Sequence, residues 1–144
     1  MSASRQFCTF YLEDQLFGLD VLCVQEVVRQ QSFTRVPLAH RVVRGLSNLR
    51  GQIVTALDLR RRLDLPDLDE SHEPMNVVVQ TDEGPVSLLV DGIGDVLELP
   101  DEQFERPPET LRGPARDVIQ GAYKLPSRLL TILDMNKIVS LPAP

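Results

Sequence analysis

Short runs of apolar residues, separated by turn signals, follow this chain almost from end to end. Residues 7–22 form two such runs around Glu13-Asp14-Gln15, which predicts a β-hairpin. Residues 76–81 and 86–90 flank Asp82-Glu83-Gly84-Pro85 and predict a second hairpin. Further strands are predicted at 52–57, 93–99, 118–125 and 129–133, and at 24–29, where the pattern also fits the start of a helix. Many short strands with few helices are typical of small barrels or sandwiches.

Three short helices are predicted between the strands. The segment Pro37–Arg44 begins with proline and is followed by Gly45, and both residues are helix boundary signals. Two aspartates each directly follow a predicted strand, in position to cap a helix N-terminus. These caps and helices are Asp58 before Leu59–Leu63, and Asp134 before Met135–Val139. Residues 66–74 are polar and acidic and predict an exposed loop, and the proline-rich segment 100–117 predicts a long loop or short helical turns.

The second half of the chain resembles the first. Residues 45–65 align with 121–141 at an offset of 76, with six identities, and residues 17–28 align with 86–97 at an offset of 69. The seven-residue difference falls in the proline-rich segment 100–117. Buried strands use few residue types, so a chance likeness is the alternative. Because the two blocks recur in the same order, we predict two similar β-rich units in one chain.

Composition and charge narrow the possible functions. At 144 residues and 42% hydrophobic residues, the chain is the size of one domain with an aliphatic core. The net charge of −6 argues against nucleic-acid binding, which needs a positive field. Cys8 and Cys23 are too few for a disulfide scaffold and fit reduced thiols in a cytoplasmic protein. With no apolar run of signal-peptide or membrane-span length, we expect a soluble protein without direct membrane insertion.

Patterns that bind metals, phosphates or cofactors are weak in this sequence. His40 and His72 have no partners at metal-ligand spacing. The glycines of Asp91-Gly92-Ile93-Gly94-Asp95 do not match the dinucleotide-binding pattern and indicate a bend between strands. Arg60-Arg61-Arg62 is read as the solvated face of a helix. We therefore expect no metal, no cofactor and no catalytic residues.

Two charged residues stand inside apolar stretches. Glu26 lies within Val24–Val28, and Arg50 lies between Leu46 and Val54. A charge in such a place either faces solvent from the outer side of its strand or has a partner. Glu26 and Arg50 are therefore either independent surface charges, or a pair on a common binding surface.

The motifs around these charges resemble those of CheW-type chemotaxis coupling proteins. The central likeness is Asn48-Leu49-Arg50-Gly51-Gln-Ile-Val followed by Leu57-Asp58-Leu59-Arg60. Residues 17–27 and 90–96 fit the same family, and the resemblance extends over residues 7–141. Thr55 departs from the family, which commonly has proline there. We therefore expect one CheW-like domain over 7–141, made of two similar subdomains that can exchange strands.

The resemblance implies an all-β fold of two intertwined five-stranded SH3-like barrels with short terminating helices. It implies a non-catalytic adaptor that bridges a CheA-type histidine kinase to methyl-accepting chemoreceptors. The helical tip of the receptor is expected in an apolar groove between the barrels, and the kinase's similar domain is expected to pack barrel against barrel. The motif match implies a first-barrel wall and, from two valines, part of the opposite wall of this groove. The wall residues are Val24, Glu26, Asn48, Arg50 and Gly51, with Val90 and Val96 opposite.

Two alternatives keep this fold and change the role. The chain could be the CheW-like regulatory module of a kinase, but 144 residues beginning at Met1 leave no room for ATP-binding and dimerisation segments. We therefore expect an intact adaptor. It could also serve another chemosensory output, such as pilus motility.

Overall fold

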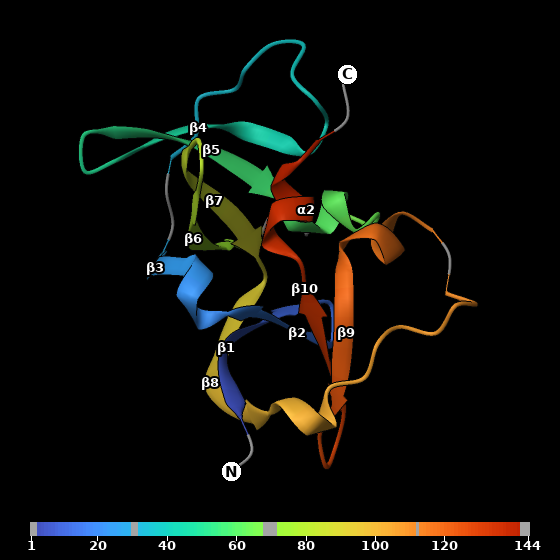
Figure 1. The fold of residues 1–144 in the computed structure, drawn as a ribbon. Helices are drawn as coiled ribbons and strands as arrows, with labels where there is room; N and C mark the ends of the chain where they lie inside the picture. Colours follow the sequence, from blue (N-terminus) through green and yellow to red (C-terminus); the bar gives the residue numbers. More distant parts are fainter. Residues whose placement is uncertain (1–2, 30–31, 68–71, 112, 142–144) are drawn as a thin grey trace.

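The computed structural model contains two five-stranded β-sheets, each curled into a small barrel, with two short α-helices at their junction (Figure 1). It describes residues 3–29, 32–67, 72–111 and 113–141. Barrel 1 has the strand order β8-β1-β2-β10-β9, and barrel 2 has the order β3-β6-β7-β5-β4. The strands are β1 Ser4–Leu12, β2 Gln15–Asp20, β3 Val24–Val28, β4 Val43–Leu49, β5 Gln52–Asp58, β6 Met75–Thr81, β7 Gly84–Val90, β8 Gly92–Pro100, β9 Ile119–Lys124 and β10 Leu129–Leu133. The predicted all-β fold is confirmed.

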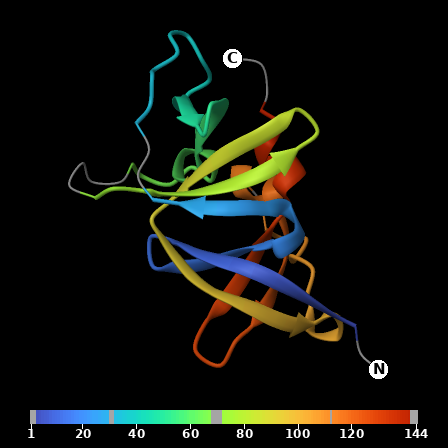
Figure 2. The same ribbon diagram turned by 90° about the vertical axis from the view of Figure 1, so that its left-hand side faces the viewer.

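The two sequence repeats do not correspond to the two barrels, because each barrel takes strands from both repeats. The first hairpin, β1–β2, joins the last three strands in barrel 1, whereas β6–β7 joins β3, β4 and β5 in barrel 2. The chain crosses from barrel 1 to barrel 2 through the 3-10 turn η1, Val21–Cys23, and returns at Asp91 between β7 and β8. Figure 2 shows these crossings, which make the two halves intertwined.

The strand register follows the sequence repeat. The parallel pair of β10 and β2 places Thr131 opposite Phe17, and the parallel pair of β5 and β7 places Thr55 opposite Val86. The first members of these pairs are 76 residues apart and the second members 69 apart, which are the two offsets found in the sequence. The predicted internal duplication is therefore present in the hydrogen-bonded framework itself.

Two short helices follow the equivalent strands β5 and β10, each capped as predicted. Helix α1 is Leu59–Arg62, and Asp58 Oδ1 accepts a hydrogen bond of 3.2 Å from Arg61 N. Helix α2 is Met135–Val139, and Asp134 Oδ1 accepts a bond of 3.3 Å from Lys137 N. Arg62 donates to the Lys137 and Ile138 carbonyls, so the helices lie side by side at the barrel junction.

The predicted helix over Pro37–Arg44 is wrong. Residues 37–42 form turns and irregular chain, Val43 and Arg44 already belong to β4, and Leu38 has a positive φ of 61°. Gly45 is needed for another reason: Thr34 pairs with Leu46, and a Cβ on Gly45 would lie 2.5 Å from the Thr34 carbonyl oxygen. Gly121 faces the same approach from the Glu105 carbonyl, at 2.4 Å. The glycine therefore marks close contact between chain segments and not the end of a helix.

The segments left open by the sequence are now assigned. Residues 24–28 form a strand, as one of the two interpretations held. The predicted loop 66–74 lies partly outside the described residues. The proline-rich segment contains two 3-10 turns, η2 Asp101–Gln103 and η3 Pro114–Val118. Among the described residues, the helices are too short to cross a membrane.

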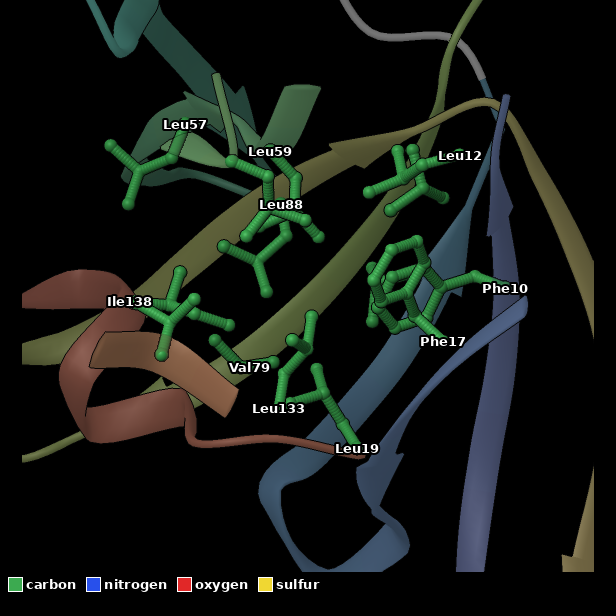
Figure 3. Close-up of a cluster of buried hydrophobic side chains, with 14 of the residues drawn as sticks. Phe10, Leu12, Phe17, Leu19, Leu57, Leu59, Val79, Leu88, Leu133 and Ile138 are labelled. Carbon is green, nitrogen blue, oxygen red and sulfur yellow. The ribbon is translucent and has the colours of Figure 1, made fainter. Parts of the chain in front are cut away.

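The main core lies at the junction of the barrels and is built by both (Figure 3). Barrel 1 supplies Phe10 and Phe17, whose rings are stacked at 6.2 Å, and barrel 2 supplies Leu57 and Leu88. Helix α2 adds the fully buried Ile138. Because these side chains leave water together, the two barrels form one packed body around a common core.

Candidate functional site

A two-residue turn joins β4 and β5 in the hairpin that projects from barrel 2 (Figure 1). Arg50 and Gly51 form this turn with φ angles of 53° and 86°. Positive φ at both central residues is the geometry that matches the twist of a hairpin, and Gly51 adopts it without strain. Asn48 Oδ1 accepts a hydrogen bond of 2.8 Å from Gly51 N. The turn thus presents the Arg50 side chain in a fixed direction.

Arg50 forms an ion pair with Glu26, in which Arg50 Nη1 donates to Glu26 Oε2. The Arg50 side chain is 73% exposed and that of Glu26 is 20% exposed. Glu26 lies on β3 and Arg50 follows β4, and these are the two edge strands of barrel 2. An exposed pair of this kind stabilises a protein by only about 0–1 kcal/mol. Its effect is to hold two charges in place on the surface.

The structure separates the remaining predicted site residues. Val24 lies on β3 beside Glu26 and is partly buried against the main core. Val96 lies on β8 of barrel 1 opposite Cys8, and its side chain is largely exposed. Val27, which the sequence analysis did not select, is also exposed on β3. Val27 and Val96 are 69 residues apart and occupy equivalent places on equivalent strands. The selection of Val96, combined with this offset, could therefore have pointed to Val27.

Val90 does not belong to this surface, and its expected place in a groove wall is corrected. It lies in β7 of barrel 2, the same barrel as β3, and is 1% exposed. Its side chain packs in the main core because four consecutive residues at the end of β7 are buried from both sides. Val90, which directly precedes the crossing at Asp91, therefore contributes to the core and not to the surface.

An ion cluster around the buried Arg60, at the chain crossing, was missed by the sequence analysis. Arg60 donates from Nε and Nη2 to the two Asp91 carboxylate oxygens, at 2.7 and 2.5 Å. Arg60 Nη1 donates to Glu13 Oε1 at 2.6 Å and to the Pro66 carbonyl at 2.7 Å. The Arg60 side chain is 9% exposed, so its interpretation as part of a solvated helix face is wrong. Hydrogen bonding to Asp91 raises the pKa of Arg60, and the guanidinium stays charged.

Two further features concern metal binding and the two cysteines. They contain no cluster of three or more His, Cys, Asp or Glu residues able to hold a metal ion. Burial, and then the nearby Asp20 charge, raises the pKa of Cys8, and the same two causes, joined by Asp134, raise the pKa of Cys23. A raised pKa makes a thiol a weaker nucleophile at neutral pH.

Comparison with known proteins gives a consistent result. A family model for a CheW-like domain matches residues 6–143. The chemotaxis protein CheW of Klebsiella aerogenes is 30% identical over 139 residues, which cover 96% of this chain and 84% of that protein. The chemotaxis protein CheW of Treponema pallidum is 28% identical over 139 residues, 94% of this chain and 82% of that protein. The crystal structure of the scaffolding protein TtCheW from Thermoanaerobacter tengcongensis has a similar fold, with a TM-score of 0.87 at 24% identity over 96% of this chain and 94% of that one.

Proposed function

This chain belongs to the CheW-like family and is a chemotaxis adaptor, and we propose that it joins a CheA-type histidine kinase to the cytoplasmic tips of methyl-accepting chemoreceptors. We also propose that it does so in the cytoplasm and without catalysis of its own.

The observation that carries the proposal is the Arg50–Glu26 pair beside the exposed Val27 on β3. A helix that docks on a protein uses apolar contacts for affinity and a few fixed polar groups for register. Barrel 2 offers both, because the Arg50-Gly51 turn fixes the guanidinium and Glu26 holds it. We propose that the receptor helix lies against a surface formed by Val24, Glu26, Asn48, Arg50 and Gly51, with Val96 contributing from barrel 1. The kinase would dock through its own similar domain, barrel against barrel.

Charge reversal tests this surface. Arg50→Glu and Glu26→Arg should each reduce co-purification of receptor and kinase about tenfold, which corresponds to about 1.4 kcal/mol of binding free energy. The double reversal should recover part of the binding if the pair acts as a unit. Pull-down of both partners measures the effect, and circular dichroism confirms the fold.

Barrel 1 provides the matched control. Lys124 and Glu105 form an exposed pair at 3.4 Å, with Lys124 at the position equivalent to Asn48. Lys124→Glu and Glu105→Lys should leave assembly unchanged. Full assembly by the folded Arg50 and Glu26 variants, or an equal loss in the Lys124 and Glu105 variants, would refute the proposed receptor surface.

A further inference from the structure

A hollow of about 1040 Å³ opens between the turns before β4 and helix α1. It shares no lining residue with the proposed receptor surface. Its wall combines cationic and apolar side chains, of which Arg35, Leu38, Arg41, Arg44 and Arg61 are the ones that matter here. Four arginines at one place make this region positively charged, although the chain as a whole has a net charge of −6.

The chain already places a carboxylate among these arginines. Asp67 accepts hydrogen bonds from Arg61 Nε and Nη2, at 3.0 and 3.3 Å. Bonding to Arg61, and then the charges of Arg61, Arg44 and Arg41, lower the pKa of Asp67. An exposed carboxylate is thus held by a guanidinium fork, the geometry with which arginine recognises carboxylates.

The arginines retain donors for a further anion. Arg44 uses Nη1 on Asp58 Oδ2, at 3.2 Å, and Arg41 uses Nη1 on the Arg61 carbonyl, also at 3.2 Å. Arg35 is exposed, and the ion pairs among the described residues do not include it. Each arginine has five N–H donors, so most of the donors around the hollow are still open to a ligand.

An exposed leucine supplies the apolar part of the hollow. Leu38 is 97% exposed and has a φ of 61°, a conformation that non-glycine residues rarely adopt. Such a residue contributes almost nothing to the chain's own core and strains its backbone. Strain held at a surface position is a reason to look for a binding role.

We propose that this hollow docks an acidic segment of a partner protein, whose carboxylates pair with Arg35, Arg41 and Arg44 and whose apolar side chain rests on Leu38. The proposal goes beyond receptor coupling and does not depend on it, because the two surfaces have no residue in common. The acidic character of the occupant follows from charge complementarity. The apolar side chain distinguishes this occupant from a simple anion.

Fluorescence anisotropy with a dye-labelled peptide tests the proposal on the full chain. The probe is Glu-Asp-Leu-Glu-Asp-Leu-Glu, and the neutral control replaces each acid with its amide. The acidic probe should bind at 50 mM salt and weaken at least tenfold at 500 mM, because exposed ion pairs are screened. Arg35→Glu and Arg41→Glu should each weaken it at least tenfold. Asp67→Asn should strengthen it, since the internal carboxylate no longer competes.

Two further variants, Arg106→Glu and Leu38→Gly, control for general charge effects and for loss of folding. Arg106 lies in the corresponding bridging segment of the other half, next to Glu105 as Arg35 lies next to Thr34, so Arg106→Glu should leave binding unchanged. Leu38→Gly should raise the melting temperature by relieving strain and yet weaken binding severalfold. Four results would each overturn the proposal. Two concern the probe: equal binding of the neutral peptide, or displacement of the acidic peptide by millimolar phosphate. The other two are stronger binding of a DNA oligonucleotide at the same arginines, and an equal loss of binding in Arg106→Glu.

Discussion

The two barrels share one strand order and one register, yet they are filled in different ways. Barrel 1 is filled by large apolar side chains, with Phe7 and Phe104 each 5.5 Å from the ring of Tyr123. At the positions equivalent to Phe7 and Tyr123, barrel 2 has Asn76 and Ser47. All of these except the partly buried Phe104 are buried. The repeated backbone therefore tolerates two very different interiors.

Neighbouring positions compensate for the difference in volume. In barrel 1, Gly18 makes room, because a Cβ there would lie 3.2 Å from Ile132 Cδ1. Its equivalent in barrel 2 is Ser87, whose hydroxyl donates to Asn76 Oδ1 at 2.8 Å. In barrel 1 large side chains lie next to a glycine, whereas in barrel 2 two small polar side chains are hydrogen-bonded to each other. Duplication preserved the hydrogen-bonded framework, while each interior was repacked as a set.

The surfaces differ in the same way as the interiors. The counterparts of Glu26 and Arg50 in barrel 1 are Asp95 and Pro126, which cannot form an ion pair. The strained arginine turn and its partner therefore exist only in barrel 2. Barrel 2 carries all of the proposed receptor surface except Val96, and barrel 1 has the interior with the larger apolar side chains.

Truncation inside each barrel should give the largest contrast. Phe7→Ala should lower the free energy of unfolding by about 3–5 kcal/mol, as expected for a large buried aromatic residue. Asn76→Ala at the equivalent position should cost about 1–3 kcal/mol, because it leaves the Ser87 hydroxyl unpaired. Urea denaturation measures both. Equal losses would mean that the interiors contribute alike despite their composition.

The ion cluster at one crossing should give the next largest effect. Arg60→Met leaves the partly buried Asp91 without its cation and should cost about 3 kcal/mol, the lower end of the range for a broken buried pair, because Asp91 and Glu13 are both partly exposed. The equivalent residue on α2 is the exposed Asn136. Asn136→Ala should change stability by less than about 0.5 kcal/mol. Similar losses in thermal unfolding would contradict the asymmetry of the two crossings.

The two helix caps offer a smaller contrast. Asp134→Ala should cost about 1 kcal/mol, the usual value for a lost N-cap. Asp58→Ala should cost about 2 kcal/mol, the upper end for caps, because Asp58 is buried and also accepts from Arg44. Chemical denaturation of both variants checks the order. If Asp134→Ala lowered the free energy of unfolding more than Asp58→Ala, the bond between Arg44 and Asp58 would not contribute to stability.

The smallest effect is a gain. The Tyr123 hydroxyl is buried and has no hydrogen-bond partner among the described residues. Tyr123→Phe should therefore raise the free energy of unfolding by about 1 kcal/mol. Tyr11→Phe, at a partly exposed tyrosine of the same barrel, serves as the control and should change little. A loss of stability in Tyr123→Phe would reveal a partner for this hydroxyl.

The repeat made much of this fold predictable from sequence. Most strand positions, though not β4, and both aspartate caps follow from local patterns. The equivalence of Thr55 and Thr131 follows from the offset of 76. The exchange of strands between barrels does not follow from periodicity. A strand has the same pattern whichever barrel it enters, and the direction of the chain at Asp91 is decided by long-range pairing. Only the family resemblance implied intertwined barrels.

The pairing of Glu26 with Arg50 was one of the two interpretations that the sequence left open, and the structure contains this pair. Asn48, Arg50 and Gly51 are residue types that favour a tight turn, and they form one. Glu26 and Arg50 are noticeable in the sequence because they are charges among apolar residues. Arg60 was misread because its partners, Glu13 and Asp91, are distant in sequence and meet it only at the crossing. The error at Val90 has the same origin, since burial at a crossing depends on both barrels.

The exchange of strands also decides what would happen if the chain were cut between α1 and β6. Each fragment would carry strands of both barrels, so neither barrel would belong to one fragment. The fragments could part only if both sheets and their common core came undone together. Such a nicked protein would behave as an interlocked heterodimer, whose survival depends on dilution. Two genes, each encoding one repeat, could in principle supply the whole adaptor.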